Sequence, residues 1–530
     1  MPIWRRPKHS GTTGGDKSKK TDGQPPNTLP PSRPSTGKSL ENKLDWFQQQ
    51  FKNCSDVIVR QFDLSSGQSS ALIYIRGLIN QTTAQDFIIR SLQEEADSLE
   101  KPEDIYKFLF EDKGLSVSQN KITEDMNEGL DAILDAGALL LIDGDNRMMT
   151  FSISSYPTRS IEEPPNESVI RGPRESFIED LEINLTLMRR RLKNKGFKTE
   201  SLIIGTKTKT DIVLTYIDGI CKPELVDEMK RRLSYIEIDS VLGSSYIEES
   251  IEDNPYSPFP QVQYTERPDV VAAALLEGRL GLFVDGTPMA LIVPVTLTML
   301  LQSSEDYFQR FIAATWIRWI RFFFSFISLL LPSLYIAITT FHPEMIPPQF
   351  LRTIAAAREI VPFPAFLEAF MMELAFEALR EASVRIPKSI GQAVSIIGAL
   401  IIGTAAVEAG IVSAAMVIIV SLTGIASFII PHFDLGLSFR LLRFPIMFLA
   451  AMFGLYGIAC GLILIYIHLN NLASFGVPYL SPVAPLVVSD LKDTVVRAPW
   501  YKMHKRPLQT AAVNPTRQKK DSRGWAKDKG

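Results

Sequence analysis

The chain has 530 residues, of which 45% are hydrophobic, and a formal net charge of −3. This length allows two or three domains, and the near-neutral charge leaves no general basic surface for binding nucleic acid. Three cysteines and five histidines are scattered without metal-like or redox-like spacing, which indicates a reducing compartment and predicts neither a metal site nor a cofactor.

Both ends of the chain are basic. Residues 1–40 hold eight Lys/Arg, two Asp and seven Pro, so we expect 1–44 to be a disordered tail. Residues 471–530 form a basic C-terminal tail. Its last part, 491–530, holds eleven Lys/Arg and three Asp, and we expect it to be disordered and able to lie on anionic lipid headgroups.

The charged N-terminal half contains an internal duplication. Tyr74-Ile75-Arg76-Gly77 is repeated as Tyr216-Ile217-Asp218-Gly219, and Asp143-Gly144 as Asp285-Gly286, both at an offset of 142. Each copy has an apolar strand, an amphipathic helix and two apolar runs around Asp-Gly, a hairpin signal. The sequence therefore predicts two duplicated mixed α/β modules, at 45–157 and 199–305, forming an α+β soluble half.

A linker helix is expected between the modules, at 158–198. Phe177, Leu181, Leu185 and Met188 have helical core spacing, and the three arginines 189–191 would cap the helix C-terminus. The helix is either a structural linker or a hinge.

No catalytic or nucleotide-binding motif occurs in the chain. Asp143 and Asp285 are interpreted as turn residues. We therefore do not expect an enzyme.

The C-terminal half predicts a polytopic α-helical membrane domain at 306–470. Four stretches without charge, each of roughly 18 residues or more, are long enough to cross ~30 Å of hydrocarbon as helices. They lie at 322–341, 390–407, 409–431 and 444–467.

The segment 360–382 is predicted to be re-entrant, a fifth span or an interfacial helix. Pro362, Phe363 and Pro364 forbid a regular helix, and broken backbone at membrane depth requires a protein or aqueous partner. Ionisable groups at that depth are functional candidates. The candidate membrane-depth acids are Glu368, Glu373, Glu377 and Glu408.

One face of the second span is small or weakly polar. At 100° per residue its members lie within roughly 80° of arc. This face suits either close helix packing or the wall of a pore. Its residues are Gln392, Ser395, Ala399, Gly403, Ala406 and Gly410.

The positive-inside tendency gives conflicting topologies. Arginines before the first span place the soluble half in the cytoplasm, and the basic tail also favours that side. Four crossings satisfy both but export a second set of basic residues, whereas five crossings export the tail. That second set is Arg380, Arg385, Lys388, Arg440 and Arg443.

Several long segments resemble the A-subunit (GerA/KA/BA) family of spore germination receptors of endospore-forming Bacillota. The resemblance runs from about residue 45 to 498 and includes, in order, TERPDVVAAALLEGRLGLFVDGTPMALIVP, SSEDYFQRF, VPFPAFLEAF, RIPKSIGQAVSIIGALIIGTAAVEAGIVS and SFGVPYLSPVAP.

The resemblance implies a multi-pass protein of the spore inner membrane with its soluble half on the core side. It would form a homo-oligomer, contact membrane lipid, and work with a transporter-like B subunit and a lipoprotein C subunit. An ion channel-like role in germination is implied. A sporulation-stage paralogue acting as accessory channel or scaffold and, less favoured, a secondary transporter are the alternatives.

Overall fold

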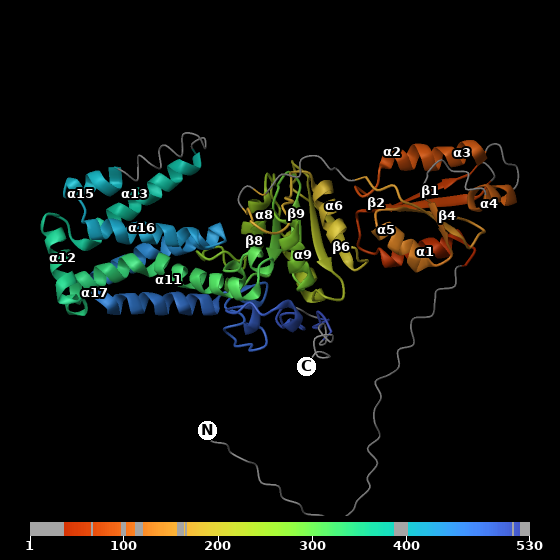
Figure 1. Cartoon of the computed structure of the whole chain (residues 1–530). Coiled ribbons are helices and arrows are strands. Elements are labelled where there is room, and N and C mark those ends of the chain that lie inside the picture. The colour runs from red at the N-terminus through yellow and green to blue at the C-terminus, as the bar shows by residue number, and fades with distance from the viewer. Residues whose placement is uncertain are drawn as a thin grey trace, which may run out of the picture.

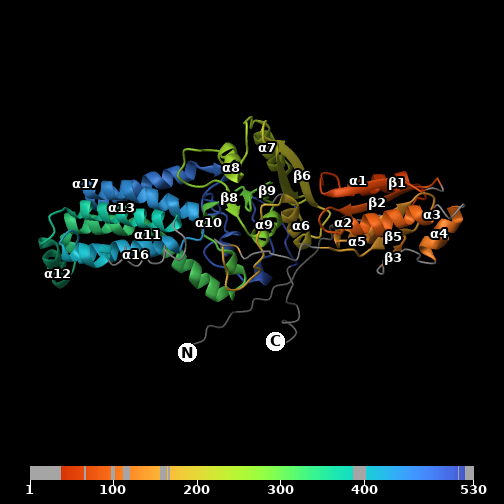
Figure 2. The same ribbon diagram turned by 90° about the horizontal axis from the view of Figure 1, so that it is seen from above.

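The computed structural model describes residues 37–64, 67–96, 102–111, 120–155, 164, 167–385, 401–510 and 513–519. Two sheet modules and a bundle of long helices lie in a row, with the second module in the middle (Figure 1, Figure 2). The predicted fold class, an α+β N-terminal half followed by long apolar helices, is confirmed.

The first module is one antiparallel sheet of strand order β1-β2-β4-β5-β3 with helices on both faces. Helices α1 and α5 cover one face, and α2 to α4 cover the other. The strands are β1 (Val57–Asp63), β2 (Ser69–Ile75), β3 (Asn120–Thr123), β4 (Ala138–Ile142) and β5 (Met148–Phe151). The helices are α1 (Leu40–Gln50), α2 (Gln81–Thr83), η1 (Ala84–Arg90), α3 (Ser91–Ala96), α4 (Pro102–Phe110) and α5 (Met126–Leu134).

The second module repeats this connectivity, with strand order β6-β7-β9-β10-β8. Helices α6 and α9 pack on one face of the sheet and α7 and α8 on the other. The duplication inferred from the sequence is thus present in the topology. The elements are α6 (Leu181–Arg191), β6 (Phe197–Ile204), β7 (Thr210–Ile217), α7 (Pro223–Ser234), α8 (Ser244–Ile251), β8 (Gln263–Thr265), α9 (Pro268–Leu276), β9 (Leu280–Val284) and β10 (Ala290–Val293).

Helix α6 corrects the predicted linker. It is the counterpart of α1, and Leu185 and Met188 belong to the core of the second module together with Val271 and Leu275 of α9. Each unit therefore begins with a helix and an edge strand. Those edge strands, β1 and β6, have no continuous apolar run because their outer positions are exposed. The Asp-Gly hairpins are confirmed, with positive φ at Gly144 and Gly286.

The helical bundle extends from the second module. Its main helices are α11 (Phe311–Phe341), α12 (Pro348–Glu359), α13 (Ala365–Arg385), α16 (Ala414–Phe428) and α17 (Phe433–Asn471). Short elements connect them, namely α10 (Leu297–Leu300), η2 (Ser304–Tyr307), η3 (Pro343–Met345), η4 (Ile401–Ala405) and α15 (Ala406–Glu408). By length and composition, α11 and α17 are candidate membrane spans, and α16 is a shorter apolar helix.

Helix α17 is two antiparallel legs, which corrects the predicted single span 444–467. Gly454 has φ +62° and ψ −141°, and it separates the two helical parts. Phe259 of the second module contacts both Phe439 and His468, at ring centroid distances of 6.4 and 6.0 Å. Residues that far apart in one straight helix would be separated by about 43 Å, so the chain reverses at Gly454.

The bundle therefore has a near end, beside the second module, and a far end. At the far end Gly454 lies against Phe341, and Gly410 lies against Ile360. At the near end His432 meets Gln263, and His468 meets Ser257. Helices α11, α13, α16 and both legs of α17 run between these ends (Figure 1).

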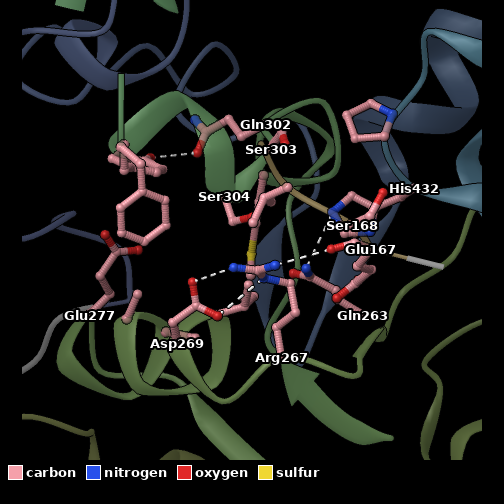
Figure 3. Close-up of a pocket in the computed structure, with 18 of the residues that line it drawn as sticks. Glu167, Ser168, Gln263, Arg267, Asp269, Glu277, Gln302, Ser303, Ser304 and His432 are labelled. Carbon is pink, nitrogen blue, oxygen red and sulfur yellow. Dashed lines mark hydrogen bonds and ion pairs between the residues drawn. The ribbon is translucent and has the colours of Figure 1, made fainter. Parts of the chain in front are cut away.

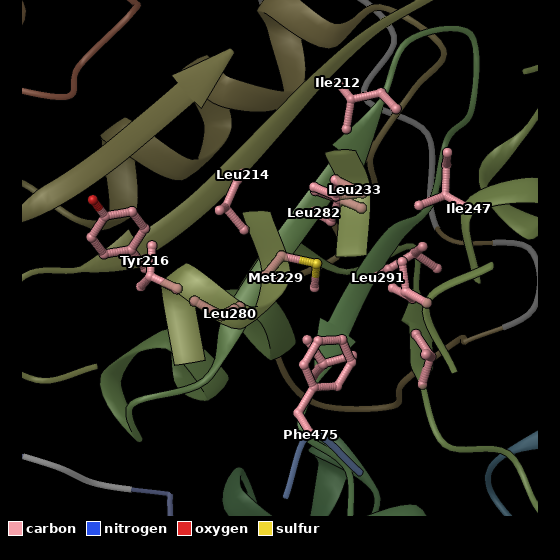
Figure 4. Packing of buried hydrophobic residues seen from close by; sticks show 14 of the residues in the cluster. Ile212, Leu214, Tyr216, Met229, Leu233, Ile247, Leu280, Leu282, Leu291 and Phe475 are labelled. Atoms are coloured by element: carbon pink, nitrogen blue, oxygen red, sulfur yellow. The ribbon is translucent and has the colours of Figure 1, made fainter. Parts of the chain in front are cut away.

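The segment after α17 is ordered on the second module as far as residue 519, which corrects the predicted disordered tail within the described range. It contains β11 (Ala473–Ser474), β12 (Val477–Pro478), η5 (Leu491–Asp493) and η6 (Trp500–Lys502). Phe475, between β11 and β12, inserts into the core beside Met229 and Leu280 (Figure 4). Arg232 stacks on the Phe475 ring, and the backbone N–H of Phe475 donates a hydrogen bond to Asp253. At the other terminus, α1 begins at Leu40, inside the predicted tail 1–44.

Candidate functional site

Helix α13 carries three acidic side chains that contact neighbouring helices, and two of them lie in the interior of the bundle. The helix packs against α11, α16 and α17, and Glu368 and Glu373 are both fully buried. A helix lying on the membrane surface would leave its acids in water. From Ala365 onward the segment 360–382 is thus a helix packed on three neighbouring helices with two of its acids buried, which differs from the interfacial alternative.

Glu373 is paired with Arg443, near the middle of the bundle. Arg443 donates from Nη1 to Glu373 and from Nε to the backbone carbonyl of Ser328, the latter at 2.8 Å. Both charged side chains are at most 2% exposed. A buried charge is tolerated only when paired and hydrogen-bonded, so this contact ties α13, α17 and α11 together.

Glu377 lies one turn further toward the near end and faces two arginines. Arg380 Nη1 is 3.3 Å and Arg440 Nη1 is 3.8 Å from the Glu377 carboxylate. Arg380 also donates to Ser427 of α16 at 2.8 Å. This cluster connects α13, α16 and the first leg of α17, with two cations on one carboxylate.

Glu368 occupies the far half of the bundle. Its Oε2 accepts the backbone N–H of Ser413 at 3.0 Å, and its Oε1 lies 3.5 Å from Arg358 Nε of α12. Ser413 is the N-cap of α16, so the acid is placed where the helix dipole favours negative charge. Glu368 therefore joins α12, α13 and α16.

The Pro-Phe-Pro motif separates α12 from α13, as expected of broken backbone. Pro362 and Pro364 are exposed, and Phe363 is half-buried. Ile360, just before this motif, lies close to Gly410, whose φ is +65°. A Cβ at position 410 would lie 3.0 Å from the Ile360 side chain. Glu408, the fourth predicted acid, is exposed on α15 and does not join the buried group.

The predicted small-residue face lies partly outside the described residues. Gln392, Ser395 and Ala399 belong to the stretch 386–400, which the structure does not describe. Gly403 and Ala406 are half-buried, and an added Cβ at Gly403 meets no described atom within 4 Å. Close packing against the described part of this chain therefore does not explain glycine at position 403.

A second buried charge network anchors α11 to the near end. Asp306 accepts from Arg318 Nε at 2.9 Å and from Arg321 Nη1 at 3.0 Å, and Arg318 also reaches Asp493 at 3.1 Å. Burial raises the pKa of Asp493 to about 6, although Arg318 opposes that shift. The spacing of Arg318 and Arg321 on one helix face could have indicated this network from the sequence. Their partners Asp306 and Asp493 could not be identified in that way.

The described residues contain no group of three or more His, Cys, Asp or Glu side chains arranged to hold a metal ion. The ion pairs of the bundle connect α12, α13, α16 and α17 and so hold these helices in one register.

Comparisons with known proteins place most of the chain in one protein family. Residues 45–509 match the family model described as Bacillus/Clostridium GerA spore germination protein. The chain is 49% identical to the uncharacterized membrane protein YfkQ of Bacillus subtilis, covering 88% of this chain and 91% of that one. It is 44% identical to spore germination protein KA of the same organism, covering 92% and 89%. A crystal structure of the N-terminal domain of the A subunit of the Bacillus megaterium spore germinant receptor GerK3 is 33% identical, with a TM-score of 0.40, over 49% of this chain and 96% of that chain.

Proposed function

The chain belongs to the GerA family of spore germination proteins, and from this premise we propose that it is the A subunit of a nutrient germinant receptor in the spore inner membrane. In this role it assembles as a homo-oligomer and contacts a transporter-like B subunit, a lipoprotein C subunit and membrane lipid. It couples nutrient sensing by those partners to ion release and the start of germination.

The observation that supports a channel-like role is the set of three acids on α13, two of them buried, that contact neighbouring helices. Charged groups within a membrane are costly and are usually retained for transport or gating. Glu368, Glu373 and Glu377 are each held by arginines or a backbone N–H from neighbouring helices. Among the described residues no atom lies within 4 Å of a Cβ added at Gly403, which further supports a helix face open to water or a second subunit.

The arrangement of the legs supports an even number of crossings, namely α11, α13, α16 and the two legs of α17, with 390–407 as the sixth. The chain enters the bundle at the near end and leaves it there after α17. Both the soluble half and the C-terminal segment then lie in the cytoplasm, on the spore core side. Arg318, Arg321, Arg380 and Arg440 also lie in the near half, which agrees with the positive-inside tendency for this orientation, whereas Arg352 and Arg358 of α12 lie toward the far end.

The proposal is tested by deleting the gene in the organism that encodes it and scoring germination against a panel of amino acids and sugars. Loss of the response to one nutrient class is expected, and an unchanged response to every nutrient contradicts a receptor role. For the pore, Gly403→Leu is compared with Gly403→Ala. Only the bulky side chain should alter ion efflux, whereas unchanged efflux and assembly in both would contradict the pore-wall assignment.

A scaffold or accessory channel of sporulation is the second candidate. The chain is 49% identical to the uncharacterized membrane protein YfkQ and 44% identical to the germination protein KA, so its relatives include a protein whose name carries no role in nutrient response. Ion flux through the full chain in liposomes distinguishes a channel from a scaffold. Counterflow of a labelled nutrient in the same liposomes would instead identify a secondary transporter.

A further inference from the structure

A cavity of about 560 Å³ lies where the second module, the bundle and the C-terminal segment meet (Figure 3). This volume is within the usual range for sites that bind small molecules. The cavity is separate from the buried acids of α13, and the proposed receptor function assigns it no role.

Five parts of the chain form its walls: residues 167–169, the β8–α9 region, residues 299–308, the connector between α16 and α17, and the C-terminal segment. Val270 and Ala273 come from α9, and Tyr307 from η2, just before α11. His432 comes from the connector between α16 and α17, and Trp500 from the C-terminal segment. A molecule bound here would therefore contact the soluble half and the entrances to two membrane helices at once.

Both arginines on the wall already have carboxylate partners. Arg267 is 1% exposed, and it donates to Asp269 at 2.9 Å and to the backbone carbonyls of Glu167 and Pro173, both at 3.0 Å. Arg517 donates to Glu277 at 2.9 Å. Among the described lining residues, each arginine is thus already paired with a carboxylate, which disfavours an anionic ligand.

Hydrogen-bond acceptors, by contrast, are available. The Gln263 side chain is 4% exposed, and its Oε1 has no partner, while its Nε2 lies 3.2 Å from His432 Nε2. Burial lowers the pKa of His432 to about 4, so the neutral ring accepts from that amide. An unpaired buried carbonyl is costly, and a ligand donor would remove the cost.

Glu167 lies beside this acceptor. It accepts from Thr265 at 2.6 Å, and Gln263 and Thr265 occupy positions i and i+2 of β8, on the same face of the strand. Burial raises the pKa of Glu167 to about 7. With Glu167 ionised, the lining carries three carboxylates, on Glu167, Asp269 and Glu277, against two arginines.

The rest of the wall is largely apolar, with Val270, Met299, Phe308 and Trp500. We propose that this cavity binds a small organic ammonium ion, whose N–H groups bind Glu167 and Gln263 and whose hydrocarbon part packs on this apolar wall. Such a ligand supplies the missing donors and the missing positive charge, and an organic carboxylate supplies neither.

The test uses the full chain in detergent and three ligands of one shape: cyclohexylammonium, cyclohexanol and cyclohexanecarboxylate. Binding is followed by ligand-detected NMR and by the rise in the unfolding temperature, since a ligand of the native state stabilises it. Cyclohexylammonium should bind at least about tenfold more tightly than the alcohol, as expected for a hydrogen bond to a charged group, and the carboxylate should not bind.

Two variants locate the site. Glu167→Gln should weaken the binding of cyclohexylammonium by about tenfold or more. Ala273→Phe should remove binding by filling the cavity, because Ala273 is exposed on this wall, whereas Ala273→Ser should leave binding unchanged. Partition of the amine into detergent is equal for all variants, so it does not affect the comparison of affinities between them. Absence of binding, equal binding of the carboxylate, or full binding by Glu167→Gln or Ala273→Phe overturns the proposal.

Discussion

Arg189 binds both carboxylate oxygens of Asp56, from Nε at 2.6 Å and from Nη2 at 2.8 Å. Asp56 precedes β1 of the first module, and Arg189 lies on α6 of the second, so this ion pair joins the modules. Thr199 of β6 donates to the same carboxylate at 2.7 Å, and its backbone exchanges hydrogen bonds with Asn53 and Ser55. The modules are therefore connected by a buried polar contact as well as by the chain itself.

Removing one partner of this pair should loosen the two modules. Arg189→Met leaves Asp56 as an uncompensated buried charge, which typically costs about 3–5 kcal/mol. Hydrogen exchange at the amides of Ser55 and Thr199 should rise in the full chain. The double variant Asp56→Leu with Arg189→Met should recover much of the loss, and Lys193→Met, at an exposed ion pair with Asp135, serves as the control.

The same pair should give stability a defined pH dependence. Burial alone would raise the pKa of Asp56, but Arg189 and Thr199 hold it below its usual value. The unfolded chain then binds the proton first as pH falls, so the stabilisation is complete above about pH 4–5 and is lost through the lower, folded pKa. The difference in unfolding free energy between the wild type and Asp56→Asn should be constant near neutrality and shrink in acid. A difference that shrinks on raising the pH instead would contradict this sign.

Glu373→Gln should destabilise the bundle by about 3–5 kcal/mol, because Arg443 stays buried without its carboxylate. Glu408→Gln is the matched control and should change stability by less than about 0.5 kcal/mol, since Glu408 is exposed. Unfolding of the full chain in detergent measures both. The exchanged pair, Glu373→Arg with Arg443→Glu, should recover part of the loss. Equal effects of the two glutamine variants would show that the pair does not hold the bundle.

Close approach of the two legs of α17 requires glycine at position 457. A Cβ there would lie 2.1 Å from the Leu449 carbonyl oxygen of the other leg. Gly457→Ala should therefore destabilise the chain by about 1–3 kcal/mol, through forced separation of the legs. Gly436→Ala, on the same helix, meets nothing closer than 3.8 Å and should be neutral or stabilising. A measured unfolding temperature that falls equally for both would argue against the reversal.

The reversal also predicts which positions share one side of the membrane. In a chain lacking Cys54, Cys221 and Cys460, single cysteines replace three exposed residues, Ile203, Met345 and Val513. A membrane-impermeant maleimide should label positions 203 and 513 from the same side of oriented vesicles and position 345 from the opposite side. Labelling of 513 together with 345 would mean that the C-terminal segment lies across the membrane from the soluble half.

The sequence by itself determined the duplicated modules, the apolar helices and the acids on α13. These features depend on local patterns, namely an Asp-Gly turn between apolar runs or a charge within an apolar stretch. Such patterns can be recognised from neighbouring residues alone. The edge strands β1 and β6 escaped detection because their half-exposed positions interrupt the apolar pattern.

Only the tertiary structure decided the partners and directions. Arg189 was expected to cap a helix, yet it is buried against a carboxylate 133 positions earlier, and Arg443 pairs with an acid 70 positions earlier. The apolar pattern continues through the turn at Gly454 because both legs of α17 are apolar. Hydropathy therefore predicted one span where the structure has two legs. Hydropathy reports how much each residue avoids water, whereas pairing and chain direction depend on which distant residues share one interior.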